Sequence, residues 1–401
     1  MHRTMMQAVA LLVGMSPAVA HAQTDEARFD PYASLRWRLE QVEQEGLREA
    51  ATASTLRVRA GAIAGPWHGL SAQLEGEAVL RVGPARFNDT SNGLTQFPVV
   101  ADPSDQQLNQ AVLRWKDGAI GSASLGREAV SLDNQRWIGS VDWRQNDQTL
   151  DIARGELTAI DGIRLSYGHA WQVNRVFGSK SGQGVWRDTA IHLLRAEADA
   201  QPVGAITAYA WLLDIPDAPA SSSATFGARL VGRQVAGGTT ILLTAELARQ
   251  RDYGSNPQDF ALTYLLLEPA VVMGPVTARL GYEQLGGNGR AALQTPLATL
   301  HAFNGWADKF LVTPPDGLRD LYLDISVAPK AAGLPKGMAL KAVLHDFRST
   351  RRDRPYGREF NAQLLVPLRP KLTLLAKAAL YQSRGFATDT MKIWLQAEAR
   401  F

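Results

Sequence analysis

The sequence contains no cysteine and no apolar run long enough to cross a membrane as a helix. Without cysteine among its 401 residues, the chain cannot be held by disulfides, which excludes a small disulfide-stapled module. The nearest apolar run, residues 261–272, is interrupted by Thr263, Glu268 and Pro269 and falls short of the roughly 18 residues that a spanning helix needs. The net charge of +3 is too small to indicate nucleic-acid binding.

The N-terminal residues have the features of an export signal. Arg3 precedes the apolar run 8–13, and residues 20–22 (Ala-His-Ala) form a small-x-small cleavage site. We predict a signal peptide over residues 1–22, with Gln23 as the first mature residue, and a single domain over residues 23–401. An exported chain without disulfides must be held together by its own backbone pairing and packing.

The last ten residues alternate strictly between two faces. One face is apolar and ends in an aromatic residue: Ile393, Leu395, Ala397, Ala399 and Phe401. Successive strand side chains point to opposite faces, so this is a two-faced strand, and Trp394 is the only apolar residue on its polar face. A closed barrel would pair it with the first strand. Its aromatic end resembles the signal that outer-membrane barrels present to their assembly machinery. The alternative is a terminal edge strand of a soluble sheet.

Alternating segments of about ten residues recur along the chain, as expected of strands that cross an outer membrane. We expect eighteen, at residues 33–42, 55–63, 70–82, 108–116, 119–127, 147–154, 160–168, 188–199, 203–213, 224–234, 238–250, 259–270, 274–283, 319–328, 337–347, 358–367, 371–382 and 391–401. Short turns, such as 117–118 and 155–159, alternate with long loops, such as 83–107, 128–146 and 284–318. This asymmetry predicts an all-β fold: a transmembrane, antiparallel, up-and-down β-barrel of about 18 strands.

The two faces of these segments differ in character. Apolar residues such as Leu35, Trp37, Leu113 and Leu321 share a face that we expect to meet lipid. Aromatic residues near segment ends are expected to form interfacial girdles: Trp115, Tyr167, Trp211 and Tyr282. The alternative for the apolar face is the core of a soluble sheet.

The opposite face carries more basic than acidic residues. Its basic members are Arg36, Arg38, Arg57, Arg59, Arg81, Arg114, Lys116, Arg164, Arg229, Arg233, Arg279, Lys341, Lys377, Lys392 and Arg400. Its acidic members are Glu40, Glu75, Glu77, Glu283, Asp320, Asp324 and Glu398. Such a surplus predicts an electropositive lumen that concentrates anions. The alternative is a ladder of ion pairs that stiffens the wall.

Residues 86–151 stand apart because they are rich in Asn, Asp, Gly and Pro, which favour turns. Short motifs follow one another here, among them 86–90, 96–103, 126–128, 132–136 and 143–149. Arg127, Arg136 and Arg144 lie within or beside one long loop. Folded into the lumen, this loop would form a constriction offering bidentate contacts to carboxylates. The alternative is a surface loop bonded to itself.

In these motifs the sequence resembles the alginate export family of outer-membrane barrels. The resemblance implies an eighteen-stranded barrel with an arginine-rich pore for an anionic polyuronate, with periplasmic polysaccharide-export components as partners. It also implies that the constriction is lined or shaped by Arg127, Asp133, Asn134, Arg136 and Arg144. The loop 284–318 and the arginine-rich segment 348–358 lie outside the resemblance.

The favoured hypothesis is a passive channel in the bacterial outer membrane for an anionic solute, such as an acidic polysaccharide or oligosaccharide. Its partners would be that solute, outer-membrane lipid and lipopolysaccharide, and the assembly machinery. The first alternative is a general or uptake porin whose lumen charges are structural. The second is an enzyme built on a barrel, but the sequence shows no nucleophile elbow, phosphate loop or metal-ligand spacing. We therefore expect no enzyme, cofactor or metal.

Overall fold

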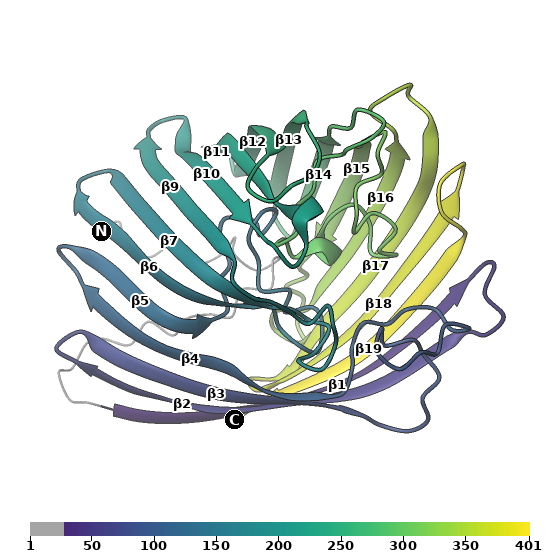
Figure 1. Ribbon diagram of the computed structural model, residues 1–401, viewed down its shortest axis with the longest axis horizontal. Helices are drawn as coiled ribbons and strands as arrows, with labels where there is room; N and C mark the ends of the chain where they lie inside the picture. Colours follow the sequence, from purple (N-terminus) through teal and green to yellow (C-terminus); the bar gives the residue numbers. More distant parts are fainter. Residues whose placement is uncertain (1–27) are drawn as a thin grey trace.

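The computed structural model describes residues 28–401, which form one closed antiparallel sheet (Figure 1). The first half of the wall is β1 (Arg28–Gln44), β2 (Ala51–Trp67), β3 (Leu70–Arg81), β4 (Asp105–Asp117), β5 (Gly121–Glu128), β6 (Thr149–Ile160), β7 (Ile163–Asn174), β9 (Ala190–Ala200) and β10 (Gly204–Asp214). The second half is β11 (Ser223–Ala236), β12 (Thr239–Asp252), β13 (Ala261–Met273), β14 (Val276–Leu285), β15 (Leu318–Val327), β16 (Ala339–Arg348), β17 (Pro355–Arg369), β18 (Leu372–Ser383) and β19 (Thr390–Arg400). These eighteen strands confirm the predicted fold class.

One further strand, β8 (Val185–Trp186), lies in the loop after β7 and pairs with the end of β7. The only helices in the described part are two single 3₁₀ turns, η1 (Pro219–Ser221) and η2 (Leu300–Ala302). Within residues 28–401, no helix is long and apolar enough to span a membrane. The predicted signal peptide, residues 1–22, lies outside the described residues.

The barrel closes between its first and last strands. β1 pairs with both β2 and β19, and in the second pairing Leu39 lies opposite Leu395. Leu395 is 45% exposed on the outer surface, whereas its neighbour Trp394 is fully buried inside. The alternation in the last ten residues therefore correctly predicted that this strand pairs with the first strand and which of its side chains face outward.

The long strands extend beyond several of the predicted boundaries. β6 continues to Ile160, although the sequence predicted a turn at 155–159. Gly155 suggested that turn, but it pairs in mid-strand with Ala123 and Tyr167. The turn is made at Asp161 and Gly162 instead, where Gly162 has φ +71°, a conformation that glycine adopts without steric cost.

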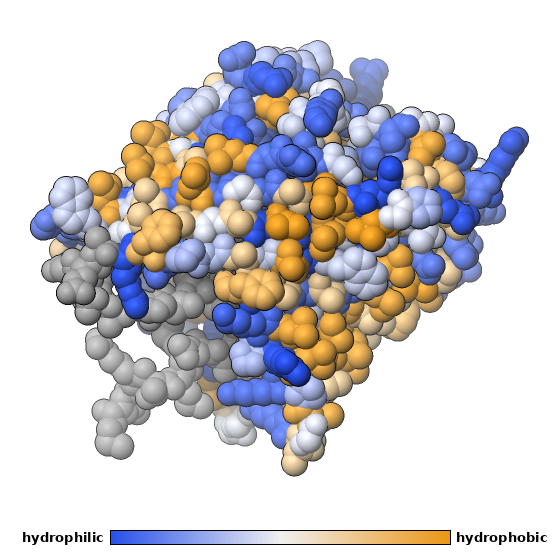
Figure 2. Space-filling view, turned by 90° about the horizontal axis from the view of Figure 1, so that it is seen from below, coloured by the Kyte–Doolittle hydropathy of each residue, from blue (hydrophilic) through white to orange (hydrophobic). Residues whose placement is uncertain are grey.

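The outer wall is apolar and the inside is packed. Leu113 is 52% exposed and Leu321 49% exposed on the outward face, and Figure 2 shows hydrophobic side chains spread across the outer surface. The girdle prediction was wrong for Trp211, which is 1% exposed and stacks on Tyr209 inside the barrel, with ring centroids 4.9 Å apart. Tyr167 does face outward, at 48% exposure.

Candidate functional site: a constriction inside the barrel

Two long loops fold into the lumen and meet there (Figure 1). We call residues 129–148, between β5 and β6, the first inner loop, and residues 286–317, between β14 and β15, the second inner loop. The backbone N–H of Gly139 donates to the carbonyl of Leu297 at 2.8 Å, and that of Thr299 donates to the carbonyl of Gln135 at 3.1 Å. The Thr299 hydroxyl also donates to the Gln135 side chain at 2.6 Å. The two loops are thus held to each other by backbone and side-chain bonds.

The first inner loop is shaped by tight local turns. Asp133, Gln135 and Val141 all have positive φ, at 50°, 65° and 55°. The N–H of Gln135 donates to the carbonyl of Leu132 at 2.8 Å, and the Asn134 side chain accepts from the N–H of Arg136 at 3.2 Å. Asn134 therefore shapes the turn that aims Arg136 across the lumen.

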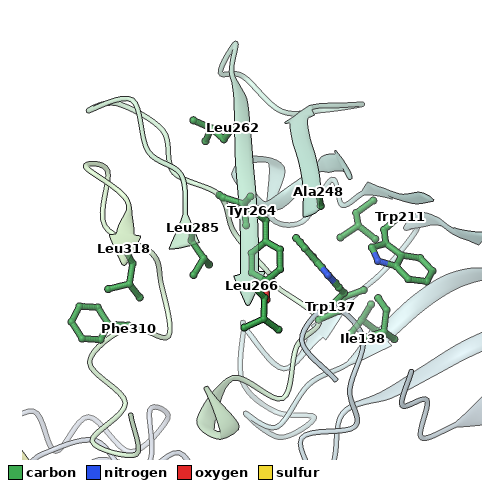
Figure 3. Close-up of a cluster of buried hydrophobic side chains, with 14 of the residues drawn as sticks. Trp137, Ile138, Trp211, Ala248, Leu262, Tyr264, Leu266, Leu285, Phe310 and Leu318 are labelled. Atoms are coloured by element: carbon green, nitrogen blue, oxygen red, sulfur yellow. The ribbon is translucent and has the colours of Figure 1, made fainter. Parts of the chain in front are cut away.

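At the far side, this loop docks on the wall made by β10, β12, β13 and β14. Trp137 donates its indole N–H to Glu246 on β12 at 2.6 Å and packs edge-on against Tyr264 on β13, with centroids 5.1 Å apart. Figure 3 shows Trp137 and Ile138 facing the wall residues Tyr264 and Trp211. These contacts fix how far the loop reaches, because an aromatic ring with a bonded N–H has one position in such a pocket.

Arg136 is fully enclosed beside this contact. Its guanidinium donates to Glu283 on β14 at 2.7 Å, to Thr295 at 3.2 Å and to Asn304 at 3.1 Å. Glu283 also accepts from the hydroxyl of Tyr264 at 2.7 Å. The donors of Arg136 are thus directed at the protein itself, and its role here is to anchor the two inner loops to the wall.

Arg144 anchors the other end of the first inner loop. It donates to Asp308 of the second inner loop at 2.9 Å and lies 3.5 Å from Glu40 on β1. Asp308 also contacts Lys392 on β19 at 2.7 Å and His301 at 2.7 Å. Although burial alone would raise the pKa of Asp308, His301, Lys392 and Arg144 hold it well below its ordinary value. Asp308 is therefore the ionised centre of a latch between loops and wall.

His301 continues this latch toward β18. Its Nε2 accepts from the ammonium of Lys377 at 2.8 Å, so Nδ1 carries the proton that bonds to Asp308. Burial lowers the pKa of His301 well below its ordinary value, and the charge of Lys377 acts in the same direction. His301 stacks on Trp143 at 4.4 Å, and the Lys377 ammonium lies 4.0 Å from the same indole ring. A neutral histidine is the form that fits this arrangement.

Two predicted arginines on β2 are also paired. Arg59 contacts Asp147 of the first inner loop at 2.6 Å and bonds to Glu77 on β3, and Arg57 lies 4.0 Å from Asp147. The side chains of Arg57 and Arg59 are 3% and 13% exposed. They position the base of the loop and offer little surface to a solute.

A more open group of charges lines the wall from β4 to β9. Arg114, Arg154 and Arg164 keep 33%, 41% and 46% of their side chains exposed. We call these three the vestibule arginines, since they lie on the inward face below the first inner loop. Glu128 pairs with Arg114 and Arg154, while Glu197 pairs with Arg164. These side chains remain within reach of a solute despite their partners.

The remaining predicted residues divide between inside and outside. Asp133 faces the vestibule, where it accepts from Arg195 at 2.9 Å. Arg127 does not face the lumen: it has the parity of the exposed Leu125 on β5, opposite to Glu128, and pairs with Asp151 at 2.7 Å. Proximity to the loop suggested a pore role for Arg127, but the strand continues to residue 128 and turns this side chain outward.

The predicted surplus of inward positive charge is largely compensated. Most of the compensating carboxylates come from loops, or from strands whose parity was unclear in the sequence: Asp102, Glu128, Asp133, Asp147, Glu197, Glu246, Glu268 and Asp308. Of these, sequence reasoning singled out only Asp133 as a pore residue. It missed the other loop carboxylates because they reach the lumen only through the loop's fold, and the strand carboxylates because their parity was unclear. Within residues 28–401, no group of three or more metal-ligating side chains is present.

No family model and no curated protein matches the chain. Among solved structures it is similar to Pseudomonas aeruginosa OccK9 (OpdG), with 16% identity, a TM-score of 0.72, and 93% of this chain and 98% of that chain covered. OccK2 (OpdF) in complex with glucuronate gives 13% identity and a TM-score of 0.70, and OpdK with vanillate gives 13% and 0.69, both with the same coverage. At these identities the similarity shows the fold.

These structural neighbours overturn the resemblance to the alginate export family. They are outer-membrane porins of the Occ family, and the motifs in residues 86–151 that suggested an alginate exporter were a wrong guide. Asn-, Asp- and Gly-rich motifs of this kind build turns, and turns recur in unrelated inner loops. A closed barrel with an apolar outer wall satisfies every strand hydrogen bond without water. The chain is a β-barrel of the bacterial outer membrane with the fold of the Occ porins.

Proposed function

We propose that this protein is an outer-membrane channel for small organic anions, with the vestibule arginines as their contact surface. The observation that carries the proposal is the difference in exposure between two sets of arginines. Arg136 and Arg144 are 2% and 8% exposed and anchor the inner loops, whereas Arg164 is 46% exposed in the vestibule. A partly exposed arginine can exchange a protein carboxylate for that of a solute, because the competing ion pair is weak in water.

The inner loops supply the selectivity of the proposed channel. They narrow the lumen above the vestibule, so we expect a solute to pass beside Arg114, Arg154 and Arg164 before or after crossing them. Contacts that are weak and repeated allow entry and exit, which conduction requires. Two of the similar structures were solved with anions of suitable size, glucuronate and vanillate, which supports a small carboxylate as the solute class for this chain.

A second candidate function is a general porin whose lumen charges are structural. The near-complete pairing of the buried arginines favours it, since Arg38, Arg57 and Arg59 all have carboxylate partners within 4.0 Å. In that case the vestibule ion pairs would also be structural. The two functions differ in whether removing vestibule charge changes ion selectivity.

The test is single-channel recording of the refolded protein in a planar bilayer under a salt gradient. The proposal expects anion selectivity and a concentration-dependent block by glucuronate. The double variant Arg154→Gln/Arg164→Gln should weaken the block severalfold and shift the reversal potential toward zero. Arg127→Gln is the matched control, because it removes an arginine on the outer surface, and it should leave both unchanged. Selectivity and block that do not respond to the vestibule variant would favour the general porin.

A further inference from the structure

The arginine-rich segment at residues 348–358 contacts the second inner loop through Arg351, which lies 3.5 Å from Asp316, but its Arg348 and Arg358 face away from the lumen. Leu344 on β16 and Phe360 on β17 are 54% and 41% exposed on the outer wall and lie opposite each other. Arg348 and Arg358 share their parity, four and two residues along each strand, so they point outward as well. Arg319 on β15 lies opposite Arg348 and has the parity of the exposed Leu321.

These three outward arginines form a positive surface at the long-loop end of the barrel. Residue 319 and residues 346–358 together carry six arginines and two aspartates, a net charge of +4 by 6 − 2. Arg358 pairs with Asp346 at 2.7 Å, and Asp353 accepts from both the Nε and the Nη2 of Arg348 at 2.8 Å and also bonds to Arg319. Asp353 is 58% exposed, so an oxyanion arriving from outside can displace it.

Directly below this surface, toward the membrane interior, the outer wall is hollowed. Ala342, Ala362 and Ala378 lie side by side in the register of β16, β17 and β18. Ile325 flanks this row on β15 and Ile393 flanks it on β19, and the resulting groove has a volume of about 560 Å³. The alanines replace the larger Leu344 and Phe360 of the row above, which explains the hollow.

The distance between the arginines and the groove matches the distance between the phosphate headgroup and the acyl chain of a lipid. Arg358 and Ala362 are four residues apart on β17, which corresponds to about 13 Å along an extended strand. The apolar row at Leu344 and Phe360 lies between them. Above the apolar belt, arginines are at the depth of lipid headgroups, where guanidinium groups bind phosphate through paired hydrogen bonds.

We propose that this surface binds a phosphorylated lipid of the outer leaflet, with its phosphate on Arg319, Arg348 and Arg358 and an acyl chain in the alanine groove. The phosphate takes the place of the Asp353 carboxylate between Arg319 and Arg348. On the opposite side of the barrel, the outward Arg127 offers no equivalent phosphate site, because its charge is matched by Asp151 at 2.7 Å. Two further outward arginines at this end, Arg249 and Arg251 on β12, lie above the exposed Leu247 and Leu265 and not above a row of alanines.

The experiment is native mass spectrometry of the full-length refolded protein in detergent, titrated with diphosphorylated lipid A. The triple variant Arg319→Gln/Arg348→Gln/Arg358→Gln should weaken binding at least tenfold, since each basic group near an anionic lipid surface contributes about fivefold to the affinity. Asp353→Asn should tighten binding, because it frees two arginines and asparagine tolerates the φ of 51° at this position. Arg127→Gln is the matched control and should bind like the wild type.

Four results would overturn the proposal. Equal binding of dephosphorylated lipid A would show that the arginines do not recognise phosphate. Displacement of lipid A by an equal concentration of inorganic phosphate would show that the groove does not hold a chain, as would unchanged binding by Ala362→Phe. A dimer that forms without lipid and is lost in Ala362→Phe would identify a second copy of the chain as the occupant. Single-channel conductance of each variant shows that the barrel has folded.

Discussion

Removing Arg136 should release both inner loops from the wall while leaving the barrel intact. The guanidinium is 2% exposed and contacts Glu283, Thr295 and Asn304. In Arg136→Met, the buried carboxylate of Glu283 keeps only the donors of Tyr264 and Asn304, at 2.7 and 2.6 Å. Breaking a buried pair by removing one partner costs about 3–5 kcal/mol. Because two donors remain, we expect the low end, about 3 kcal/mol.

This energy is the stability of the docked loops relative to the undocked loops. About 3 kcal/mol corresponds to a little over a hundredfold change in the docking equilibrium. Amide hydrogen exchange should therefore accelerate by up to that factor in residues 129–148 and 286–317, and single-channel current should become larger and noisier. Exchange in β1 and β19 should not change, since their pairing does not depend on Arg136.

The matched control is Arg136→Met/Glu283→Gln, which removes both charges. It should recover much of the lost protection, because replacing both partners of a buried pair is often close to neutral. If the single variant exchanges like the wild type, or the double variant is as open as the single one, the anchoring role assigned to Arg136 is refuted.

Three further predictions concern the latch, the second inner loop and the outer wall. The folded state holds His301 neutral, with its pKa below the ordinary 6.5, so the latch should be fully stable above about pH 6.5 and lose stability as the pH drops below that value. Single-channel conductance should therefore become noisier as the pH is lowered from 7.5 to 5, and His301→Gln should remove this pH dependence. Gly305 has φ +85°, and an added Cβ would lie 2.4 Å from the Glu359 carboxylate. Gly305→Ala should therefore destabilise the docked state of the second inner loop by about 1 kcal/mol or more, which proteolysis would detect as faster cleavage in residues 286–317. Leu323 is 40% exposed on the outer wall, so Leu323→Arg should lower the free energy of unfolding in lipid vesicles by about 2 kcal/mol, against no comparable loss for Leu323→Ile.

Strand parity was predictable from the sequence because each barrel strand meets lipid on one side. Leu35, Trp37 and Leu321 were placed correctly by alternation alone, and so was the pairing of the last strand with the first. Trp211 failed because an aromatic residue near a strand end fits two environments. It suits the membrane interface, but here it stacks on Tyr209 under the first inner loop.

The partners of the inner loops could not be predicted in the same way. Arg136 was singled out for its place in a turn-rich loop, yet its carboxylate partner is 147 residues away on β14. Asp308 was not singled out, although it joins Arg144, Lys392 and His301. Such contacts depend on how far each loop reaches across the barrel, which is a property of the closed fold and has no local periodicity.

The number of inward arginines does not by itself predict how much positive charge a barrel with inner loops offers to a solute. A loop that folds into a lumen loses hydration, so each charge it carries or covers needs an opposite charge there, as Asp147 supplies for Arg57 and Arg59. Arginines under the inner loops therefore pair with loop carboxylates and anchor the loops to the wall. Only those beyond the loops, such as Arg154 and Arg164, remain exposed enough to exchange partners. Selectivity for anions should follow the number of these exposed arginines and not the total inside the barrel.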